Sequence, residues 1–245
     1  MMSRKIRTTV VTVTATSFAM LALAWAVWEL SNSRSYQLFG ELVARVETLD
    51  SAVALTFDDG PVPGYTDSVL TLLADSSVAA TFFVVGEALA EHADLARRIV
   101  HSGHELGNHS YSHHSLVFKT PTYVRHEIHS ADSLIRAAGQ HGAIPFRPPY
   151  GKRLVILPWV LARAGRTTIL WDLEPDSYPA IARDPAQIVD HVLRNVRPGS
   201  IILLHVENPG RASGRAALPS LIGSLRAAGY EFVTVSELMR RASSG

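Results

Sequence analysis

Short apolar runs and longer amphipathic segments alternate along the chain from Ser51 to near its C-terminus. The runs are rich in β-branched and aromatic residues, as strands are, whereas apolar residues in the segments between them recur at helical spacing. Several of the predicted helices end in glycine, at Gly103, Gly139 and Gly229, as helices often do. The predicted strands are AVALTF, ATFFVV, HELGNH, IPFRP, TTILW, SIILLH and EFVTV.

This alternation predicts an α/β fold in which helices cover a parallel sheet. Seven parallel strands over about 190 residues favour a barrel-like (β/α) arrangement over a small open sheet. Of the 245 residues, 47% are hydrophobic and 18% are charged, which is typical of one larger globular domain. We place this domain at residues 50–241, preceded by a polar helical spacer over residues 29–49.

The N-terminus has a different pattern. A basic segment over residues 1–8 is followed by an uncharged, mostly apolar stretch over 9–28, which is long enough to cross a bilayer as a helix. The basic flank should stay in the cytoplasm and the rest of the chain should lie outside. The small-x-small sequence AWA, ending at Ala26, also fits a cleaved signal peptide. We favour a retained membrane anchor because Trp25 and Trp28 suit the interface; cleavage would instead give a secreted protein.

Charge and cysteine content exclude several classes of function. The net charge is +1 and no basic stripe is visible, so nucleic acid is not an expected partner. The absence of cysteine excludes thiol nucleophiles, thiolate zinc sites and disulfides. No segment points to an obligate protein partner.

Chemically active side chains follow the predicted strands. In parallel (β/α) folds the carboxyl ends of the strands carry the active site, so these residues should lie on one rim. In strand order they are Asp58 and Asp59; His109 and His113; Arg147 and Tyr150; Asp172, Glu174 and Asp176; and His205.

His109 and His113 are spaced i, i+4 in NHSYSHHS. On a helical turn this spacing puts both imidazoles on one face, while His114 points elsewhere. Together with a carboxylate they would give a three-ligand metal site with open positions, the catalytic pattern. The nearby HELGNH has one residue too many for the H-E-x-x-H signature of metalloproteases and is better explained as a strand.

The adjacent acids Asp58 and Asp59 are explained by the same ion. If Asp59 binds the metal, Asp58 can lie beside the water and accept its proton, and the cation offsets the repulsion between the two carboxylates. Gly60 and Pro61 would give the stiff turn that holds both side chains at the rim.

The motifs TFDDGP, HSYSH, RPPYG and LLH, in this order and spacing, resemble those of the polysaccharide deacetylases, the NodB-homology family of family-four carbohydrate esterases. The resemblance covers about Ala52 to Leu238. It implies a distorted seven-stranded (β/α) barrel and a divalent metal, usually zinc, for which cobalt or another divalent ion can substitute.

The resemblance also implies roles for individual residues. Asp58 would be the general base, and Asp59, His109 and His113 the metal ligands. Arg147 would orient and tune the base.

In the later motifs, the backbone N–H of Tyr150 would hold the oxyanion, Leu203 would line the pocket for the acetyl methyl group, and His205 would be the general acid. The family's Asp-Trp pair of the fourth motif is replaced by Ser177 and Tyr178, which leaves Tyr178 as the candidate wall of the substrate groove.

The carboxylate partner of His205 is then one of three acids. Asp172 directly follows the strand, Glu174 is biased toward an extended conformation by the proline after it, and Asp176 lies closest to the usual position of the acid. We choose Asp176.

These residues predict hydrolysis of an N-acetyl group on an amino sugar, with peptidoglycan or another surface glycan, or chitin fragments, as substrate. The alternatives are an amidohydrolase of small or cyclic amides and a catalytically silent glycan-binding domain. Non-haem iron oxygenases also use two histidines and a carboxylate, but they have no use for Asp58 and His205.

Overall fold

The computed structural model describes residues 4–242, with side chains described for residue 12 and from residue 14 onward. Its centre is a parallel sheet of strand order β4-β3-β2-β6, in which β7 also pairs with β2. A two-stranded parallel sheet, β1-β5, lies beside it. The strands are β1 (Leu42–Val43), β2 (Ala52–Asp58), β3 (Thr81–Val84), β4 (Glu105–Asn108), β5 (Thr168–Ile169), β6 (Ile201–Leu204) and β7 (Glu231–Phe232).

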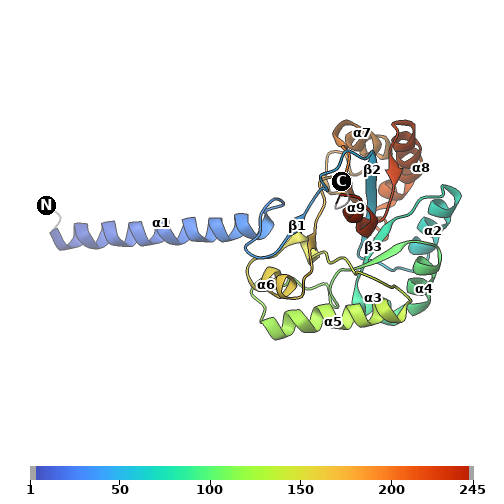
Figure 1. Cartoon of the computed structure of the whole chain (residues 1–245). Helices are drawn as coiled ribbons and strands as arrows, with labels where there is room; N and C mark the ends of the chain where they lie inside the picture. The colour runs from blue at the N-terminus through green and yellow to red at the C-terminus, as the bar shows by residue number, and fades with distance from the viewer. Residues whose placement is uncertain (1–3, 243–245) are drawn as a thin grey trace.

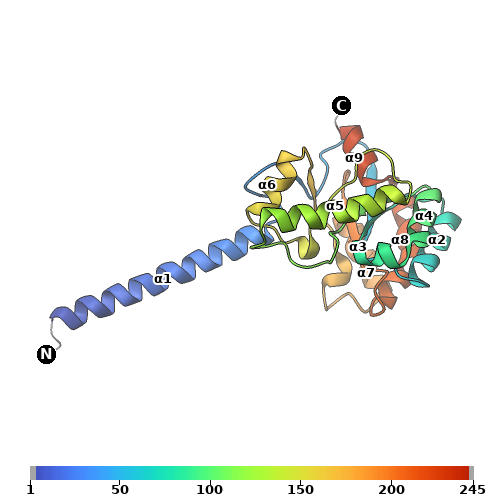
Figure 2. The same ribbon diagram turned by 90° about the horizontal axis from the view of Figure 1, so that it is seen from below.

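Helices surround the sheets (Figures 1 and 2). Because both faces of the sheet are covered, every residue of β2, β3, β4 and β6 is buried, and these strands are mostly continuous apolar runs. The helices are α2 (Tyr65–Asp75), α3 (Gly86–Glu91), α4 (Ala93–His101), α5 (Pro121–Ala137), α6 (Ile156–Arg163), α7 (Pro185–Asn195), α8 (Ala212–Ala227) and α9 (Val235–Ala242).

The predicted α/β fold with parallel strands is confirmed, but no closed barrel forms among the described residues. The predicted strand IPFRP contributes only Phe146, which makes single parallel bridges to Asn108 and Thr168. On the other side, Leu173 makes one bridge to Ile202. Single bridges do not build a ladder, so the ring of strands is interrupted at both places.

Residues 29–49 do not form the predicted polar helical spacer. The helix ends at Asn32, and β1 (Leu42–Val43) pairs with β5 inside the globular body. Val46 is buried in the same apolar cluster as Ile169 and Ile201. The segment is therefore part of the folded domain, because its few apolar residues pack against the second sheet.

The first helix, α1 (Arg4–Asn32), extends away from the rest of the chain (Figures 1 and 2). Over the residues that the structure describes, no helix combines the length and the apolar character needed to cross a membrane. The predicted membrane-spanning helix over 9–28 is thus not supported. The predicted basic segment over 1–8 lies partly outside the described residues.

Candidate active site

The strand β2 ends at Asp58, where the apolar run meets the acidic turn. Parallel pairing of β2 with β3 and β6 brings the carboxyl ends of these strands to one edge of the sheet. Asp59 follows with a positive φ of 76°, so the chain leaves the strand direction at once and the two neighbouring carboxylates point differently. Asp58 is buried, whereas the Asp59 side chain is 30% exposed.

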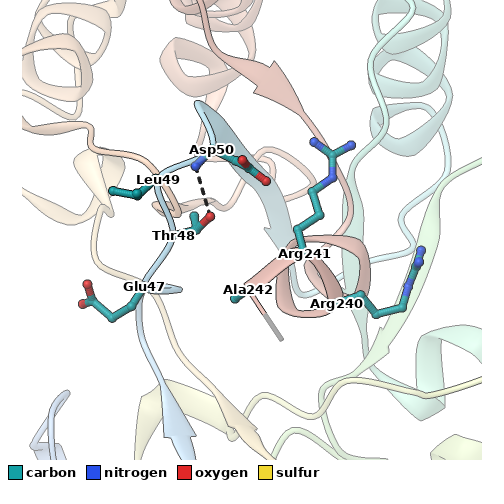
Figure 3. A pocket seen from close by; sticks show the side chains of 7 residues that line it. All are labelled: Glu47, Thr48, Leu49, Asp50, Arg240, Arg241 and Ala242. Atoms are coloured by element: carbon teal, nitrogen blue, oxygen red, sulfur yellow. Dashed lines mark hydrogen bonds between the residues drawn. The ribbon is translucent and has the colours of Figure 1, made fainter. Parts of the chain in front are cut away.

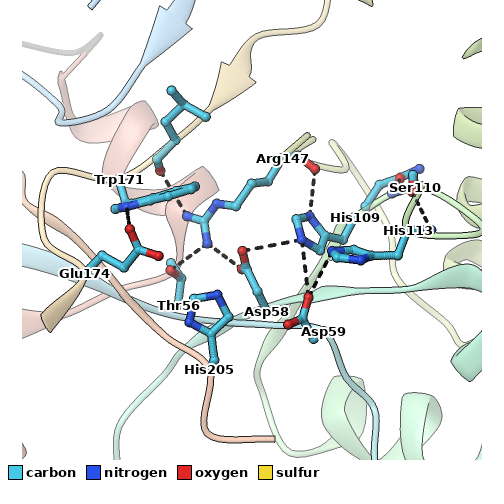
Figure 4. A network of polar contacts seen from close by, with 12 residues as sticks. Thr56, Asp58, Asp59, His109, Ser110, His113, Arg147, Trp171, Glu174 and His205 are labelled. Atoms are coloured by element: carbon cyan, nitrogen blue, oxygen red, sulfur yellow. Dashed lines mark hydrogen bonds and ion pairs between the residues drawn. The ribbon is translucent and has the colours of Figure 1, made fainter. Parts of the chain in front are cut away.

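Asp59, His109 and His113 form a compact donor set at this edge (Figure 4). Asp59 Oδ1 lies 3.6 Å from His109 Nε2 and 3.2 Å from His113 Nε2, and one donor atom from each residue falls within 4.8 Å of the others. The two imidazole rings are 4.9 Å apart between centroids. The structure thus brings the three predicted metal ligands together.

The backbone that brings His109 and His113 together is a loop and not the predicted helical turn. Residues 109–113 form a loop after β4, not a helical turn, and Ser110 and His113 have positive φ values of 67° and 56°. The Ser110 hydroxyl accepts a hydrogen bond from the His113 amide at 3.0 Å and fixes this loop. His114 is exposed, and its Nδ1 is 2.8 Å from the Ser112 hydroxyl, so it takes no part in the donor set.

The protonation of these groups fits a divalent cation. His109 Nδ1 donates to the Arg147 carbonyl at 2.8 Å, which leaves Nε2 as the ligand atom. Burial lowers the pKa of His109 and favours the neutral imidazole that binds metals. For Asp59, burial opposes ionisation, but the hydrogen bond from His113 and the nearby imidazoles outweigh it and lower the pKa to about 2. Two imidazoles and one carboxylate make a donor set suited to zinc or cobalt.

Arg147 is completely buried and fixes Asp58. Its Nη1 donates to Asp58 Oδ1 at 2.6 Å and to the Thr56 hydroxyl at 2.9 Å, and its Nη2 donates to the Leu170 carbonyl at 3.0 Å. The guanidinium also lies over the Phe83 ring at 3.9 Å. Asp58 Oδ2, the other oxygen, lies 3.6 Å from His109 Nε2, on the side of the donor set.

Among the three candidate acids, Asp176 pairs with His205. The His205 amide donates to Asp176 Oδ2 at 2.7 Å, and its Nδ1 lies 3.3 Å from Oδ1. Burial by itself lowers the pKa of His205, but the hydrogen bond to Asp176 and the charge of Asp58 outweigh it and raise the pKa to about 9. Asp172 instead accepts from Ser200 and Ile201 at the start of β6.

Glu174 has a different set of partners. It accepts hydrogen bonds from Trp171 Nε1 at 2.7 Å and from the Ser177 hydroxyl at 2.6 Å, and it forms an ion pair with Arg34. Trp171 lies at the end of the run that contains β5, and its ring is 5.4 Å from the Arg147 guanidinium. Glu174 and Trp171 therefore form one wall beside the catalytic groups (Figure 4).

The remaining predicted residues fall in different places. Tyr150 lines the site, with its ring 4.8 Å from that of His113, and its φ of 59° reflects a sharp turn. Leu203 is completely buried on β6, within the apolar core. Tyr178 is 47% exposed, and its ring packs against His191 of α7 at 5.3 Å rather than toward the donor set.

A pocket of about 340 Å³ contains the donor set, Asp58 and His205. Several of its lining residues were not predicted from the sequence. Arg34 comes from the segment expected to be a spacer and carried no local signal, whereas Trp171 could have been noted as the aromatic residue at a strand end. The additional lining residues are Arg34, Trp171, Asn208 and Arg211.

Glu207, a residue that was not predicted from the sequence to matter, explains why position 60 is glycine. This side chain is completely buried; its Oε1 accepts from the Thr66 hydroxyl, and a Cβ on Gly60 would lie 1.6 Å from its Oε2. Burial raises the pKa of Glu207 to about 8, so the carboxyl is largely protonated at neutral pH. The turn after Asp59 therefore requires glycine because a buried carboxyl occupies the space beside it.

A larger pocket, of about 760 Å³, lies between residues 47–50 and the end of α9 (Figure 3). It is next to the amino end of β2, whereas Asp58 is at the carboxyl end, and a seven-residue strand spans roughly 20 Å. The two cations on its wall already have carboxylate partners, since Arg240 pairs with Glu237 and Arg241 pairs with Glu231 and Glu237. We therefore assign the chemistry to the smaller pocket.

The fold and the site define an α/β protein with parallel strands and a candidate metal centre at their carboxyl ends. Residues 45–169 match the family model described as polysaccharide deacetylase. The chain belongs to this family, as the motif resemblance had indicated.

Individual relatives extend the match over most of the chain. It is 33% identical to a peptidoglycan-N-acetylglucosamine deacetylase of Bacillus cereus, across 82% of this chain and 94% of that protein. A chitooligosaccharide deacetylase of Azorhizobium caulinodans is 32% identical, across 76% and 94%. The structure of a family 4 acetyl xylan esterase from Clostridium thermocellum, in complex with a cobalt ion, superposes with a TM-score of 0.70 at 36% identity, across 77% of this chain and 90% of that one.

Proposed function

We propose that this chain is a metal-dependent deacetylase that removes the N-acetyl group from an amino sugar of peptidoglycan or of a chitin-like oligosaccharide. The observation that carries the proposal is the placement of a buried base, a metal donor set and a charged acid around one pocket. The names of the relatives, peptidoglycan-N-acetylglucosamine deacetylase and chitooligosaccharide deacetylase, support the same substrate classes.

Asp58 is the proton acceptor in this proposal. Arg147 holds Oδ1 at 2.6 Å, which leaves Oδ2 toward the donor set, where the attacking water has to lie. Because the guanidinium is buried and also bonded to Thr56 and Leu170, it cannot turn away, and the carboxylate keeps a single orientation. General-base removal of a proton from water at this position starts the hydrolysis.

Asp59, His109 and His113 would hold the metal, zinc or cobalt. At such a site a divalent ion supplies Lewis acidity, which polarises the acetyl carbonyl and makes water a better nucleophile at neutral pH. The cobalt ion in the related esterase structure supports a divalent metal of this kind.

His205 completes the reaction as the proton donor. With its pKa raised to about 9 and Asp176 bonded to its ring, the imidazole carries a proton at neutral pH and can deliver it to the leaving amine nitrogen. The Tyr150 N–H, in the sharp turn at the pocket, would donate to the oxygen of the acetyl carbonyl. By the family resemblance, Leu203 is the candidate contact of the acetyl methyl group. Tyr178 is the candidate contact for sugars farther from the reacting group.

Acetate release tests the proposal. Full-length protein loaded with zinc or cobalt should release acetate from N-acetylglucosamine oligomers or from peptidoglycan, a chelator should abolish the release, and added metal should restore it. Acetylated xylan should be assayed in parallel, because an acetate ester has an easier leaving group and one relative is an esterase. Failure to release acetate from any N-acetylated glycan would refute the proposal.

We also propose that the catalytic domain works outside the cytoplasm, with the basic and apolar N-terminal stretch acting as an export signal. The support is the sequence pattern and the cell-wall substrate named for the relative. In fractionated cells the domain should be accessible to added protease from outside. Protection of the whole protein in intact cells would contradict this location.

A further inference from the structure

Arg34 lies in the catalytic pocket although it comes from the segment just after α1. It lines the pocket together with Asp59, His113 and His205, which are distant from it in sequence. The nearest catalytic residue along the chain, Asp58, is 24 positions away. The active site is therefore completed by a part of the chain that precedes the four family motifs and β2, the first strand of the central sheet.

This segment is held firmly against the domain by Arg153, a completely buried residue. Its guanidinium donates to the carbonyls of Ser33, Tyr36 (3.0 Å) and Gly151 (2.9 Å), and its backbone amide donates to the Ser31 carbonyl at 3.2 Å. The chain on both sides of Arg34 is thus fixed to the turn that also carries Tyr150. The position of Arg34 follows from this anchoring and does not depend on its own side chain.

The guanidinium of Arg34 is directed along the pocket wall. Arg34 Nη2 donates to Glu174 Oε2 at 2.8 Å, and Arg34 Cζ lies 4.9 Å from the centre of the Trp171 ring. The Arg34 side chain is 44% exposed. Glu174 also accepts from Trp171 and Ser177, so its carboxylate stays bonded if Arg34 turns partly toward a ligand. The backbone of Arg34 is therefore fixed, while the N–H groups of its guanidinium face the open pocket.

A second guanidinium, that of Arg211, lines the same pocket, and it donates to the backbone carbonyl of Asp176. The carboxylates that line the pocket already have partners, since Asp58 pairs with Arg147, Asp59 belongs to the metal donor set, and Glu174 pairs with Arg34 and also bonds Trp171 and Ser177. The planar guanidinium groups at the pocket match a carboxylate better than a neutral hydroxyl.

We infer that Arg34 is a substrate-binding residue that recognises a carboxylate carried by the glycan close to the N-acetyl group that is removed. This inference rests on the proposed deacetylase function and deepens it, because it names the class of substrate: an acidic N-acetylated glycan rather than a neutral one. Arg34 holds the substrate and takes no part in the proton transfers.

The test compares two substrates that differ in one group. One is a peptidoglycan-type oligomer in which every second sugar bears an ether-linked lactate carboxylate, and the other is the same oligomer with that carboxylate reduced to the alcohol. Arg34→Gln should raise KM for the acidic oligomer roughly tenfold, as expected of one lost charge-assisted hydrogen bond, with kcat unchanged. KM for the reduced oligomer should stay the same, and Arg34→Lys should recover part of the affinity.

Arg194→Gln is the matched control, since Arg194 is an exposed arginine on α7 that pairs with Asp190 and does not line the pocket. Arg194→Gln should leave KM for both oligomers unchanged. An equal rise in KM for both oligomers in Arg34→Gln would mean that Arg34 only supports the wall formed by Trp171 and Glu174. No change for either oligomer would also overturn the inference.

Calorimetric binding of the two oligomers separates this inference from the proposed function. If the protein releases no acetate but binds the acidic oligomer more tightly through Arg34, the deacetylase function fails and the role of Arg34 stands. If it releases acetate and neither binding nor KM depends on Arg34, the deacetylase function stands and the role of Arg34 fails.

Discussion

The carboxylate of Asp176 holds His205 at two points, its backbone amide at 2.7 Å and its ring Nδ1 at 3.3 Å. The first bond fixes the chain just after β6, and the second fixes the ring. Asp176 is almost completely buried, so water does not compete for either bond. The position of the proposed acid and its charge thus depend on the same side chain.

Asp176→Asn should shift the pH–rate profile. A general acid works only while protonated, so activity falls as the pH rises through the pKa of His205, which is raised to about 9 with Asp176 present. The amide removes the negative charge, the pKa of His205 falls, and the alkaline limb should move to lower pH. Because the wild type and the variant hold the same metal, the difference between their pH–rate profiles measures the effect of Asp176 on the pKa of His205.

Glu174→Gln is the control for this experiment. Glu174 bonds Trp171, Ser177 and Arg34 rather than His205, so its change should leave the alkaline limb in place. A shift in the Glu174 variant and none in the Asp176 variant would reverse the two assignments.

Metal analysis tests the donor set. His109→Ala and His113→Ala should each lose bound metal and activity together, because each removes one of three donor atoms that lie within 4.8 Å of one another. His114→Ala should keep both, since His114 is exposed and bonds only Ser112 in this loop. Full metal occupancy in either of the first two variants would show that the site is wrongly assigned.

Asp58→Asn should separate metal binding from catalysis. The amide keeps the size of the side chain and can accept from Arg147, but it cannot take a proton from water. We expect the metal content to be retained and kcat to fall by about 10²–10⁴-fold, the usual contribution of a general base. Near-normal acetate release by the metal-loaded variant would remove Asp58 from the mechanism.

Gly60→Ala should destabilise the protein through Glu207. The added Cβ would lie 1.6 Å from Glu207 Oε2, so the buried carboxyl or the turn has to shift, at a cost of about 1–3 kcal/mol in the free energy of unfolding. In Glu207→Ala the space is open, and adding Gly60→Ala to that variant should cost much less. Urea denaturation of the four proteins of this cycle measures the coupling; additive free energies would mean that the clash is not the cause.

Local pattern was enough to predict six of the seven strands that the structure describes, the parallel sheet and the residues at its edge, whereas β1 lies in the segment predicted to be a helical spacer. The apolar run before Asp58 and the run before His205 form β2 and β6 because continuous β-type sequences are stable only when both faces are buried. The prediction failed for IPFRP, where Pro145 and Pro148 flank a single bridging residue, Phe146. Prolines lack the N–H that a ladder needs, and the closed barrel is lost there.

The geometry of the site needed the tertiary structure. The spacing of His109 and His113 suggested a helix, but two residues with positive φ in a loop bring the rings together. Such backbone conformations are set by the packing around them and leave little trace in the sequence.

By itself, the sequence determined which chemical groups this protein places at the ends of its strands, because motif residues and strand patterns are local properties. Only the tertiary structure decided that Asp176, rather than Glu174, pairs with His205, that Glu207 lies beside Gly60, and that Arg34 reaches the pocket. The separations in sequence are 29 positions for Asp176 and His205, 147 for Gly60 and Glu207, and 140 for Arg34 and its pocket partner Glu174. Only long-range packing brings residues so far apart in sequence into contact.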